Sequence, residues 1–242
     1  MTNRIENITK QKPKKVGILQ SNYLPWRGYF HLISKVDLFI FHDDLQYTKN
    51  DWRNRNVIKT PNGIQWITIP CGTNEKRLIS EVEIKDSSWQ KKHWNLIKSN
   101  YQKAPYFNFY KSFFEDFYLD KKWTNLSELN QFLIKEIAIN YLNISTTVFD
   151  DSKNHELTLF KGNRVIELLK KVNATHYISG PAAKNYISES TFKKNEIKID
   201  WMNYNNYLEY DQLHGHFQEK TSIIDLLFNL GEKSKNYLEN EK

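Results

Sequence analysis

The chain has 242 residues, 39% of them hydrophobic, which is enough to bury one sizeable core, and we expect no autonomous second domain. Lysine and arginine number 35 against 28 acidic residues, and this formal charge of +7 favours anionic partners such as nucleotides, sugar phosphates or RNA, although a solvated lysine-rich surface gives the same balance. The single cysteine, Cys71, excludes an internal disulfide and a cysteine-based zinc cluster and fits a cytoplasmic location, while no run reaches the roughly 20 apolar residues of a membrane span.

The N-terminal part of the chain predicts a strand, a helix and a second strand. Val16–Gln20 has the length and β-branched start of a buried strand, Tyr29–Lys35 has the apolar spacing of a short helix, and Leu38–Phe41 is apolar throughout. Such a βαβ unit is right-handed and pairs its strands in parallel, so both strands end at the same edge of the sheet. We therefore expect Gln20 and Asp43 to lie near one another.

A hairpin and three helices are expected to follow. Trp52–Ile58 and Ile64–Pro70 flank the turn signal Pro61-Asn62-Gly63, which predicts two antiparallel strands, and Val82–Ile84 has the length of a minor strand. From residue 87 the periodicity becomes helical. The expected helices are Trp89–Tyr101 with Ser88 as N-cap, Pro105 to about Tyr118, and a third that follows Asn125 or Ser127 and reaches Tyr141.

The C-terminal part alternates strands and helices, which favours a parallel or mixed sheet covered on both faces. The expected strands are Thr146–Phe149, His176–Ser179 and Ile197–Met202, and the expected helices are Leu159–Val172, Ala182–Ile187 and Thr221–Leu230. The predicted fold class is α/β, a largely parallel sheet with an N-terminal βαβ nucleotide-binding-like unit and a helical insertion at about 87–142. This single domain is expected over residues 16–231, between a flexible basic extension at 1–15 and a C-terminal tail at 232–242.

The glycines exclude several motifs. Only eight glycines occur, and even the closest pair, Gly63 and Gly72, is too far apart for a dinucleotide-binding GxGxxG or a phosphate-binding GxxxxGK[ST]. A GxSxG nucleophile elbow and a kinase signature are missing as well. If the sheet binds a nucleotide, it does so with other devices.

The turn after the first expected strand is the first candidate binding site. A strand end that feeds a helix N-terminus offers free N–H groups and a positive helix end to a phosphate or carboxylate. Gln20 and Asn22 are polar groups where burial begins, and Arg27 adds charge. Tyr23 and Trp26 complete this substrate-binding set, and an ordinary turn with both aromatic rings in the core is the alternative.

The stretch from Asp43 to Lys59 is the second candidate. Asp43 and Asp44 are candidate catalytic carboxylates, as general base and orienting acid, or as ligands that hold Mg²⁺ against a diphosphate. Arg53 and Arg55 are expected to share one strand face and to match a diphosphate with two guanidinium groups. The remaining candidate substrate-binding residues of this stretch are Gln46, Tyr47, Trp52, Asn54 and Lys59. A solvated strand face with its charges paired to neighbouring aspartates is the alternative.

Two later segments carry further candidates. Ser179 and Gly180 form a tight turn between a strand and a helix start, where Lys184 can reach an anion, although a plain capping turn is equally consistent. His214 and His216 are separated by one glycine, and His214 is a candidate general base. No cysteine or dense carboxylate cluster adjoins them, so no metal site is predicted.

Several long motifs resemble those of the WbqC-like protein family. They are QSNYLPWRGYF, DDLQYTKNDWRNRNVIKTPNG followed by WITIP, the helical KKH and KAPYF, YISGPAAKNYI, and QLHGHF with SIIDLLFNLG. The resemblance runs from about Val16 to Gly231, and one departure is Ser21, where the family pattern has proline. It implies a bacterial, cytoplasmic protein associated with gene clusters that build surface polysaccharide such as O-antigen, and it does not define a reaction.

From the residues and the resemblance together we expect an enzyme that transfers an acyl or aminoacyl group to the amino sugar of a nucleotide-linked sugar. Its partners would be that sugar and an acyl or aminoacyl donor, which could be linked to tRNA, and Mg²⁺ is a candidate cofactor. A nucleotidylyltransferase-like enzyme is one alternative, with His31 near the first turn. A non-catalytic protein that binds a sugar nucleotide or RNA is another. The sugar, the donor and the oligomeric state stay open.

Overall fold

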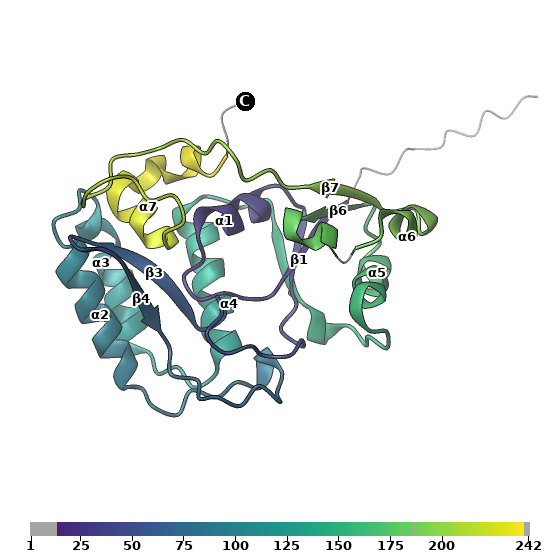
Figure 1. Ribbon diagram of the computed structural model, residues 1–242, viewed down its shortest axis with the longest axis horizontal. Coiled ribbons are helices and arrows are strands. Elements are labelled where there is room, and N and C mark those ends of the chain that lie inside the picture. The colour runs from purple at the N-terminus through teal and green to yellow at the C-terminus, as the bar shows by residue number, and fades with distance from the viewer. Residues whose placement is uncertain (1–13, 186, 240–242) are drawn as a thin grey trace, which may run out of the picture.

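The computed structural model describes residues 14–185 and 187–239 and places a five-stranded sheet at the centre of the chain (Figure 1). The strands are β1 (Lys15–Leu19), β2 (Leu38–Phe41), β5 (Val148–Asp151), β6 (His176–Ser179) and β7 (Lys198–Trp201). They pair in the order β5-β2-β1-β6-β7, and every pair is parallel. The expected α/β class with a largely parallel sheet is confirmed. The extension expected at 1–15 lies almost wholly outside the described residues.

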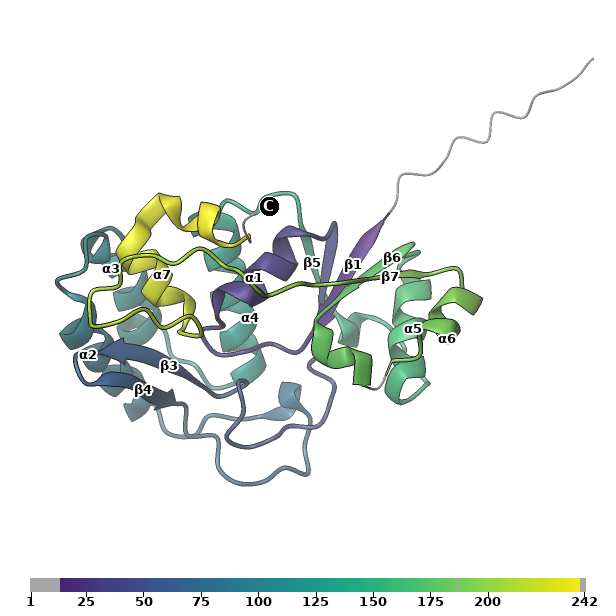
Figure 2. The same ribbon diagram turned by 45° about the horizontal axis from the view of Figure 1, so that its top comes forward.

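Helices cover both faces of the sheet, because the central strands carry apolar side chains on both sides. Ile18 and Ile40 belong to a buried cluster with α5 and α6, whereas Phe39 and Phe41 belong to a larger one with α1, α4 and α7. Figure 2 shows these two groups of helices on opposite sides of β1. The helices are α1 (Arg27–Ser34), α2 (Ser88–Tyr101), α3 (Phe107–Glu115), α4 (Leu126–Glu136), α5 (Lys161–Lys171), α6 (Glu189–Lys194) and α7 (Ile223–Leu230).

The connection from β2 to β5 contains most of the remaining structure. The expected hairpin is formed by β3 (Arg55–Thr60) and β4 (Gly63–Thr68), which pair antiparallel. The helices α2, α3 and α4 follow, and α4 begins after Asn125, whose side chain accepts a hydrogen bond from the Glu128 N–H at 3.0 Å. This is one of the two helix starts that the sequence suggested. Short helical turns complete the chain: η1 (Ile79–Glu81), η2 (Asp116–Asp120), η3 (Ile137–Tyr141), η4 (Ser152–Asn154), η5 (Pro181–Asn185) and η6 (Gly231–Tyr237).

After β7 the chain crosses back over the molecule to α7, which lies beside α1 and β3 (Figure 1). Two backbone bonds hold this return, from the Ser222 N–H to the Val57 carbonyl and from the Ile223 N–H to the Pro25 carbonyl. The return segment therefore joins the sheet to the helical insertion.

Four elements differ from the sequence expectation. The expected helix at 182–187 is the 3-10 turn η5, and α6 was not anticipated, because six residues are too few to show a helical period. The expected strand at 82–84 contributes only an isolated bridge between Glu83 and Asn125. The expected tail begins with η6, and its Leu238 side chain is buried in the core.

Candidate functional site

The strand order places a topological switch point between β1 and β6. From β1 the chain proceeds to β2 and β5 on one side, and then returns to β6 and β7 on the other. Open parallel sheets bind ligands outside the carboxyl ends of their strands at such a point. Gln20, Ser21 and Asn22 follow β1 there, Ser179 ends β6, and Gly180 follows it.

Around this point lies a group of residues that we call the switch-point cluster: Gln20, Asn22, Arg53, Asn130, Gly180 and Tyr204. Arg53 Nη2 donates to Gln20 Oε1, and Arg53 Nη1 lies 3.0 Å from Asp51 Oδ2. The Asn130 amide donates to the Arg53 carbonyl at 2.8 Å and to the Ser21 hydroxyl at 3.4 Å. The cluster therefore joins the end of β1, the turn before β3, and α4.

Three side-chain atoms in the switch-point cluster are buried without a hydrogen-bond partner among the described residues. They are the acceptors Asn22 Oδ1 and Asn130 Oδ1 and the donor Arg53 Nε. The Arg53 side chain as a whole is 16% exposed. Unpaired buried atoms also occur elsewhere in the described residues, as at Arg27, Asn54 and Arg164, so it is the position of this set at a switch point that makes it a candidate site for a polar ligand.

Gly180 follows β6 and Tyr204 follows β7, and the two residues are in contact at the carboxyl ends of these strands. A Cβ atom on Gly180 would lie 3.6 Å from the Tyr204 hydroxyl, so the phenol packs against the bare glycine backbone. Burial raises the pKa of Tyr204, with Tyr177 nearby, which keeps the phenol neutral and able to donate. Ser179 turns away from this edge and donates to the Tyr177 hydroxyl at 3.3 Å.

Asp43 is fully buried beside the cluster, as the expected neighbour of the end of β1. Its Oδ1 accepts from the Ser21 N–H at 2.7 Å, and its Oδ2 accepts from Ser127 at 2.5 Å and Gln131 at 3.2 Å. A proline at position 21 would lack this N–H. Burial raises the pKa of the Asp43 carboxyl, while the bonds from Ser127 and Ser21 act in the opposite direction. Asp43 thus ties β1 to α4 and has no solvent-facing oxygen.

Asp44 lies at the adjoining end of β2 in a second polar group. Its Oδ1 accepts from Ser152, its Oδ2 accepts from Arg164 of α5, and His42 Nε2 lies 3.5 Å from Oδ1. Burial alone would raise the pKa of Asp44, but the bond from Ser152 and the charges of His42 and Arg164 outweigh it and lower the pKa. Asp44 therefore stays ionised and links the ends of β2 and β5 to α5.

The two arginines expected to share a strand face lie in different settings. Arg53 belongs to the turn before β3, whereas Arg55 is the first residue of β3 and its guanidinium lies 4.2 Å from the Trp66 ring centroid. Trp52 is 44% exposed and packs against Trp66 at 5.5 Å between centroids. Only Arg53 reaches the switch-point cluster.

The aromatic and basic residues of the first turn are mostly structural. Tyr23 is buried, and its hydroxyl bonds with Tyr118 at 2.5 Å and His93 at 2.9 Å. The indole of Trp26 covers Gly28, because a Cβ there would lie 2.3 Å from the ring. Arg27 is buried against the Tyr207 ring and donates to the Leu208 carbonyl.

The other candidates of the stretch from Asp43 to Lys59 are spread over the insertion. Lys59 is buried and donates to Gln212 and to the carbonyls of Gly215 and His216, so it fastens the return segment. Asn54 is buried and donates to the Ile69 carbonyl. Gln46 is exposed near Arg77, whose guanidinium lies over the buried ring of Tyr47.

The histidines and Lys184 are also placed away from the switch-point cluster. His214 Nε2 donates to the Asn100 carbonyl at 2.7 Å at the end of α2, and His216 is exposed. Lys184 lies 5.4 Å from the Trp201 ring centroid. Within residues 14–185 and 187–239, no three histidine, cysteine, aspartate or glutamate side chains are grouped to hold a metal ion.

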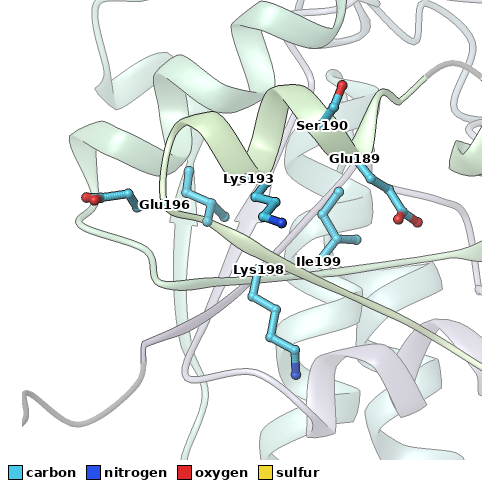
Figure 3. Close-up of a pocket in the computed structure, with 7 residues that line it drawn as sticks. Glu189, Ser190, Lys193, Glu196, Lys198 and Ile199 are labelled. Atoms are coloured by element: carbon cyan, nitrogen blue, oxygen red, sulfur yellow. The ribbon is translucent and has the colours of Figure 1, made fainter.

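A surface hollow of the molecule lies elsewhere. About 590 Å³ in volume, it lies between α6 and β7 and is lined by Glu189, Ser190, Lys193, Glu196, Ile197, Lys198 and Ile199 (Figure 3). In Figure 3 the polar ends of Ser190, Glu196 and Lys198 point in different directions, so they do not converge on one ligand. Ligand sites carry a few convergent polar groups, and we therefore place the candidate site at the switch point.

Sequence reasoning missed the contribution of α4. Ser127, Asn130 and Gln131 are buried and repeat at three and four positions, which puts them on one face of the helix. This polar stripe in an otherwise apolar helix face is a readable signal. Ser152, Arg164 and Tyr204 carried no comparable signal, because isolated polar residues near strand ends are common.

The comparisons with known proteins cover nearly the whole chain. The WbqC-like protein family matches residues 20–237, and the chain therefore belongs to the WbqC-like protein family. It is 45% identical over 227 residues to the uncharacterized protein Rv1507c of Mycobacterium tuberculosis (strain ATCC 25618 / H37Rv), covering 93% of this chain and 97% of that protein. No solved structure matches. No helix in the described part of the chain is long and apolar enough to cross a membrane.

Proposed function

We propose that the protein is a transferase of bacterial surface-polysaccharide biosynthesis that moves an acyl or aminoacyl group onto the amino sugar of a nucleotide-linked sugar. The diphosphate of that sugar would bind at the switch-point cluster. The observation that carries this proposal is the Arg53 guanidinium, which bonds with Gln20 while its Nε is buried without a partner at the reversal of strand order.

Charge and hydrogen-bonding chemistry support an anionic ligand there. A guanidinium offers donors in a fixed plane that matches phosphate oxygens, and Arg53 already has its carbonyl held by Asn130. Asn22 Oδ1 and Asn130 Oδ1 supply acceptors for hydroxyl or amide hydrogens of the same ligand. An anion with neighbouring hydroxyl groups, as in a sugar diphosphate, satisfies both kinds of atom.

The roles that we propose for Asp43 and Asp44 differ from the catalytic roles expected from the sequence. Asp43 and Asp44 have all four oxygens occupied by donors, so we assign them to positioning the ends of β1 and β2. In the reaction, the amine nitrogen bonds to the acyl carbon, the bond from that carbon to its leaving group breaks, and the amine proton passes to the leaving group. The residues of the cluster would orient the amine, and such orientation makes a large contribution to the rate of group transfer.

Binding of nucleotide-linked amino sugars, measured by calorimetry with and without Mg²⁺, tests the proposal. Arg53→Gln should weaken binding about 10- to 100-fold, because a hydrogen bond to a charged group contributes roughly 1.5–3 kcal/mol. Lys49→Gln is the matched control, since it removes the same charge from an exposed position of the same segment. Mass spectrometry of the sugar after mixing with acyl thioesters or aminoacyl esters then reports transfer.

Three outcomes separate the alternatives. Equal loss of affinity in Arg53→Gln and Lys49→Gln would mean that general surface charge binds the ligand and would overturn the assignment to Arg53. Binding without a mass increase for any donor would favour a non-catalytic binding protein. No observation supports nucleotidylyl transfer. His31, the residue named for that alternative, is buried with its Nδ1 2.7 Å from the Tyr207 hydroxyl.

A further inference from the structure

The outer surface of the β3–β4 hairpin exposes two indole rings side by side. Trp52 is 44% exposed and Trp66 is 45% exposed, and their centroids lie 5.5 Å apart with 34° between the ring planes. Arg55 lies over the Trp66 ring at 4.2 Å. We call Trp52, Arg55 and Trp66 the indole platform. Other tryptophans of the chain, such as Trp89 and Trp94, are buried in the core, so this exposure is particular to the hairpin.

The exposure belongs to β4 and not to β3. Trp66 is paired with Val57, and Ile64 with Lys59, yet Val57 and Lys59 are buried, whereas every residue of β4 except Ile67 is exposed. Clustered exposed apolar side chains on a soluble chain commonly mark a binding surface.

The platform adjoins the switch-point cluster in the chain. Trp52 and Arg53 are consecutive residues, with Cα atoms about 3.8 Å apart. Arg53 reaches Gln20 at the switch point, whereas Trp52 reaches Trp66 on the hairpin. This adjacency is the basis for the link that we infer between the two sites.

The chemistry of the platform favours a nucleobase over a sugar ring. Indole faces and guanidinium planes both stack on flat conjugated rings, and the positive charge of Arg55 suits a phosphate next to such a ring. Sugar hydroxyls are recognised through side-chain acceptors, and the Asp51 carboxylate already accepts from Thr48 and Trp52 and pairs with Arg53. Asn54 Oδ1 has no partner, but it is buried.

We infer that the indole platform of Trp52, Arg55 and Trp66 is a nucleobase-stacking site. This inference rests on the proposed function for its connection to the diphosphate site. The base belongs either to the nucleotide-linked sugar or to the single-stranded end of an RNA that carries the donor group. Both sources present the same flat, conjugated ring beside a phosphate.

Calorimetric titration tests this site. The ligands are UDP, GDP and dTDP, and each is compared with inorganic pyrophosphate, a probe without a base. The wild-type protein should bind at least one diphosphate nucleotide about tenfold or more tightly than pyrophosphate, since a stacked base contributes that much in comparable sites. Trp66→Ala should remove this difference while leaving the pyrophosphate affinity unchanged. Trp66→Phe should restore most of it, and Phe160→Ala, which removes an aromatic ring 81% exposed on the far side of the sheet, should change nothing.

The second arm uses a single-stranded RNA of about eight nucleotides, the length that common stacking sites cover. One outcome is that the wild-type protein binds the RNA, that Trp66→Ala weakens this binding, and that no free nucleotide binds. This outcome would support the platform and reject the sugar nucleotide as its ligand. Nucleotide binding that Arg53→Gln weakens but Trp66→Ala does not would keep the proposed function and overturn the platform. Binding of neither probe would overturn the platform as well.

Discussion

At the ends of β2 and β5, every carboxylate oxygen of Asp43 and Asp44 has a donor, whereas beside β1 and β6 the atoms Arg53 Nε and Asn22 Oδ1 have none. Both groups lie at the same edge of one sheet. In the first group the carboxylates are fully bonded and join strands to α4 and α5, although His42 Nε2 and Arg164 Nε there have no hydrogen-bond partner among the described residues. In the second group the amide oxygens of Asn22 and Asn130 are also without a partner, so the difference between the two groups lies in whether their acceptors are satisfied.

Removal of the Asp43 side chain is expected to have the largest effect, and it tests whether the first group of bonds holds the fold. Asp43→Ala leaves the Ser21 N–H and the side chains of Ser127 and Gln131 without their acceptor, so we expect the free energy of unfolding to fall by about 3 kcal/mol. Urea unfolding measures it. Asp43→Asn keeps one acceptor oxygen and should cost less. A loss below about 1 kcal/mol in Asp43→Ala would show that the set of bonds is not what holds β1 to α4.

A double-mutant cycle tests the other carboxylate. Asp44→Ala and Arg164→Ala should each destabilise the chain, and their coupling energy should be about 1–2 kcal/mol, because the two side chains are in contact and only 15% and 16% exposed. Urea unfolding of the wild type, both single variants and the double variant gives the coupling. Additive effects would mean that the ion pair is solvated and does not join β2 to α5.

Arg53→Gln should behave in the opposite way. It loses contacts to Gln20 and to the partly exposed Asp51, and we expect a stability change of about 0.5 kcal/mol despite a large loss of ligand affinity. Thermal unfolding with and without ligand separates the two effects. A stability loss as large as that of Asp43→Ala would place Arg53 with the structural groups.

The neighbouring aspartates should respond to pH with opposite signs. Burial raises the pKa of Asp43, so its ionisable group stabilises the fold below its ordinary pKa and loses that contribution as pH rises. The pKa of Asp44 is lowered although burial opposes this, so its contribution is present above its ordinary pKa and is lost as pH falls. Unfolding of Asp43→Asn and Asp44→Asn, each compared with the wild type between about pH 3 and pH 7, should show stability differences whose slopes against pH have opposite signs. Parallel slopes would contradict the assigned shifts.

Local patterns in the sequence were enough for much of the fold. Leu38–Phe41 and His176–Ser179 were predicted with the bounds that the structure has, because short apolar runs between turn residues have few other interpretations. The proximity of the ends of β1 and β2 followed from the handedness of βαβ units and is confirmed by the bond from Ser21 to Asp43. Periodicity could not predict the 3-10 turn η5 or the short helix α6, since each has too few residues to show a helical period.

The candidate site was only partly readable. The sequence singled out Gln20 and Arg53, which the structure brings together, and the nearby Asn22, and it also named Arg27 and Lys59, which are buried and bond with the return segment. Residue type alone does not distinguish a cation that binds a ligand from one that binds a carbonyl of its own chain. The missing side of the site came from Asn130 and Tyr204, more than 70 residues away from Arg53 in the chain.

The sequence by itself determined the α/β class, the parallel βαβ unit and the family, because these depend on local periodicity, strand handedness and long contiguous motifs. Only the tertiary structure decided which polar groups are satisfied and which are not. That property depends on burial and on partners from distant segments, such as Ser127 on Asp43 and Arg164 on Asp44. A carboxylate becomes a structural link or a candidate for chemistry according to the donors that folding brings to it.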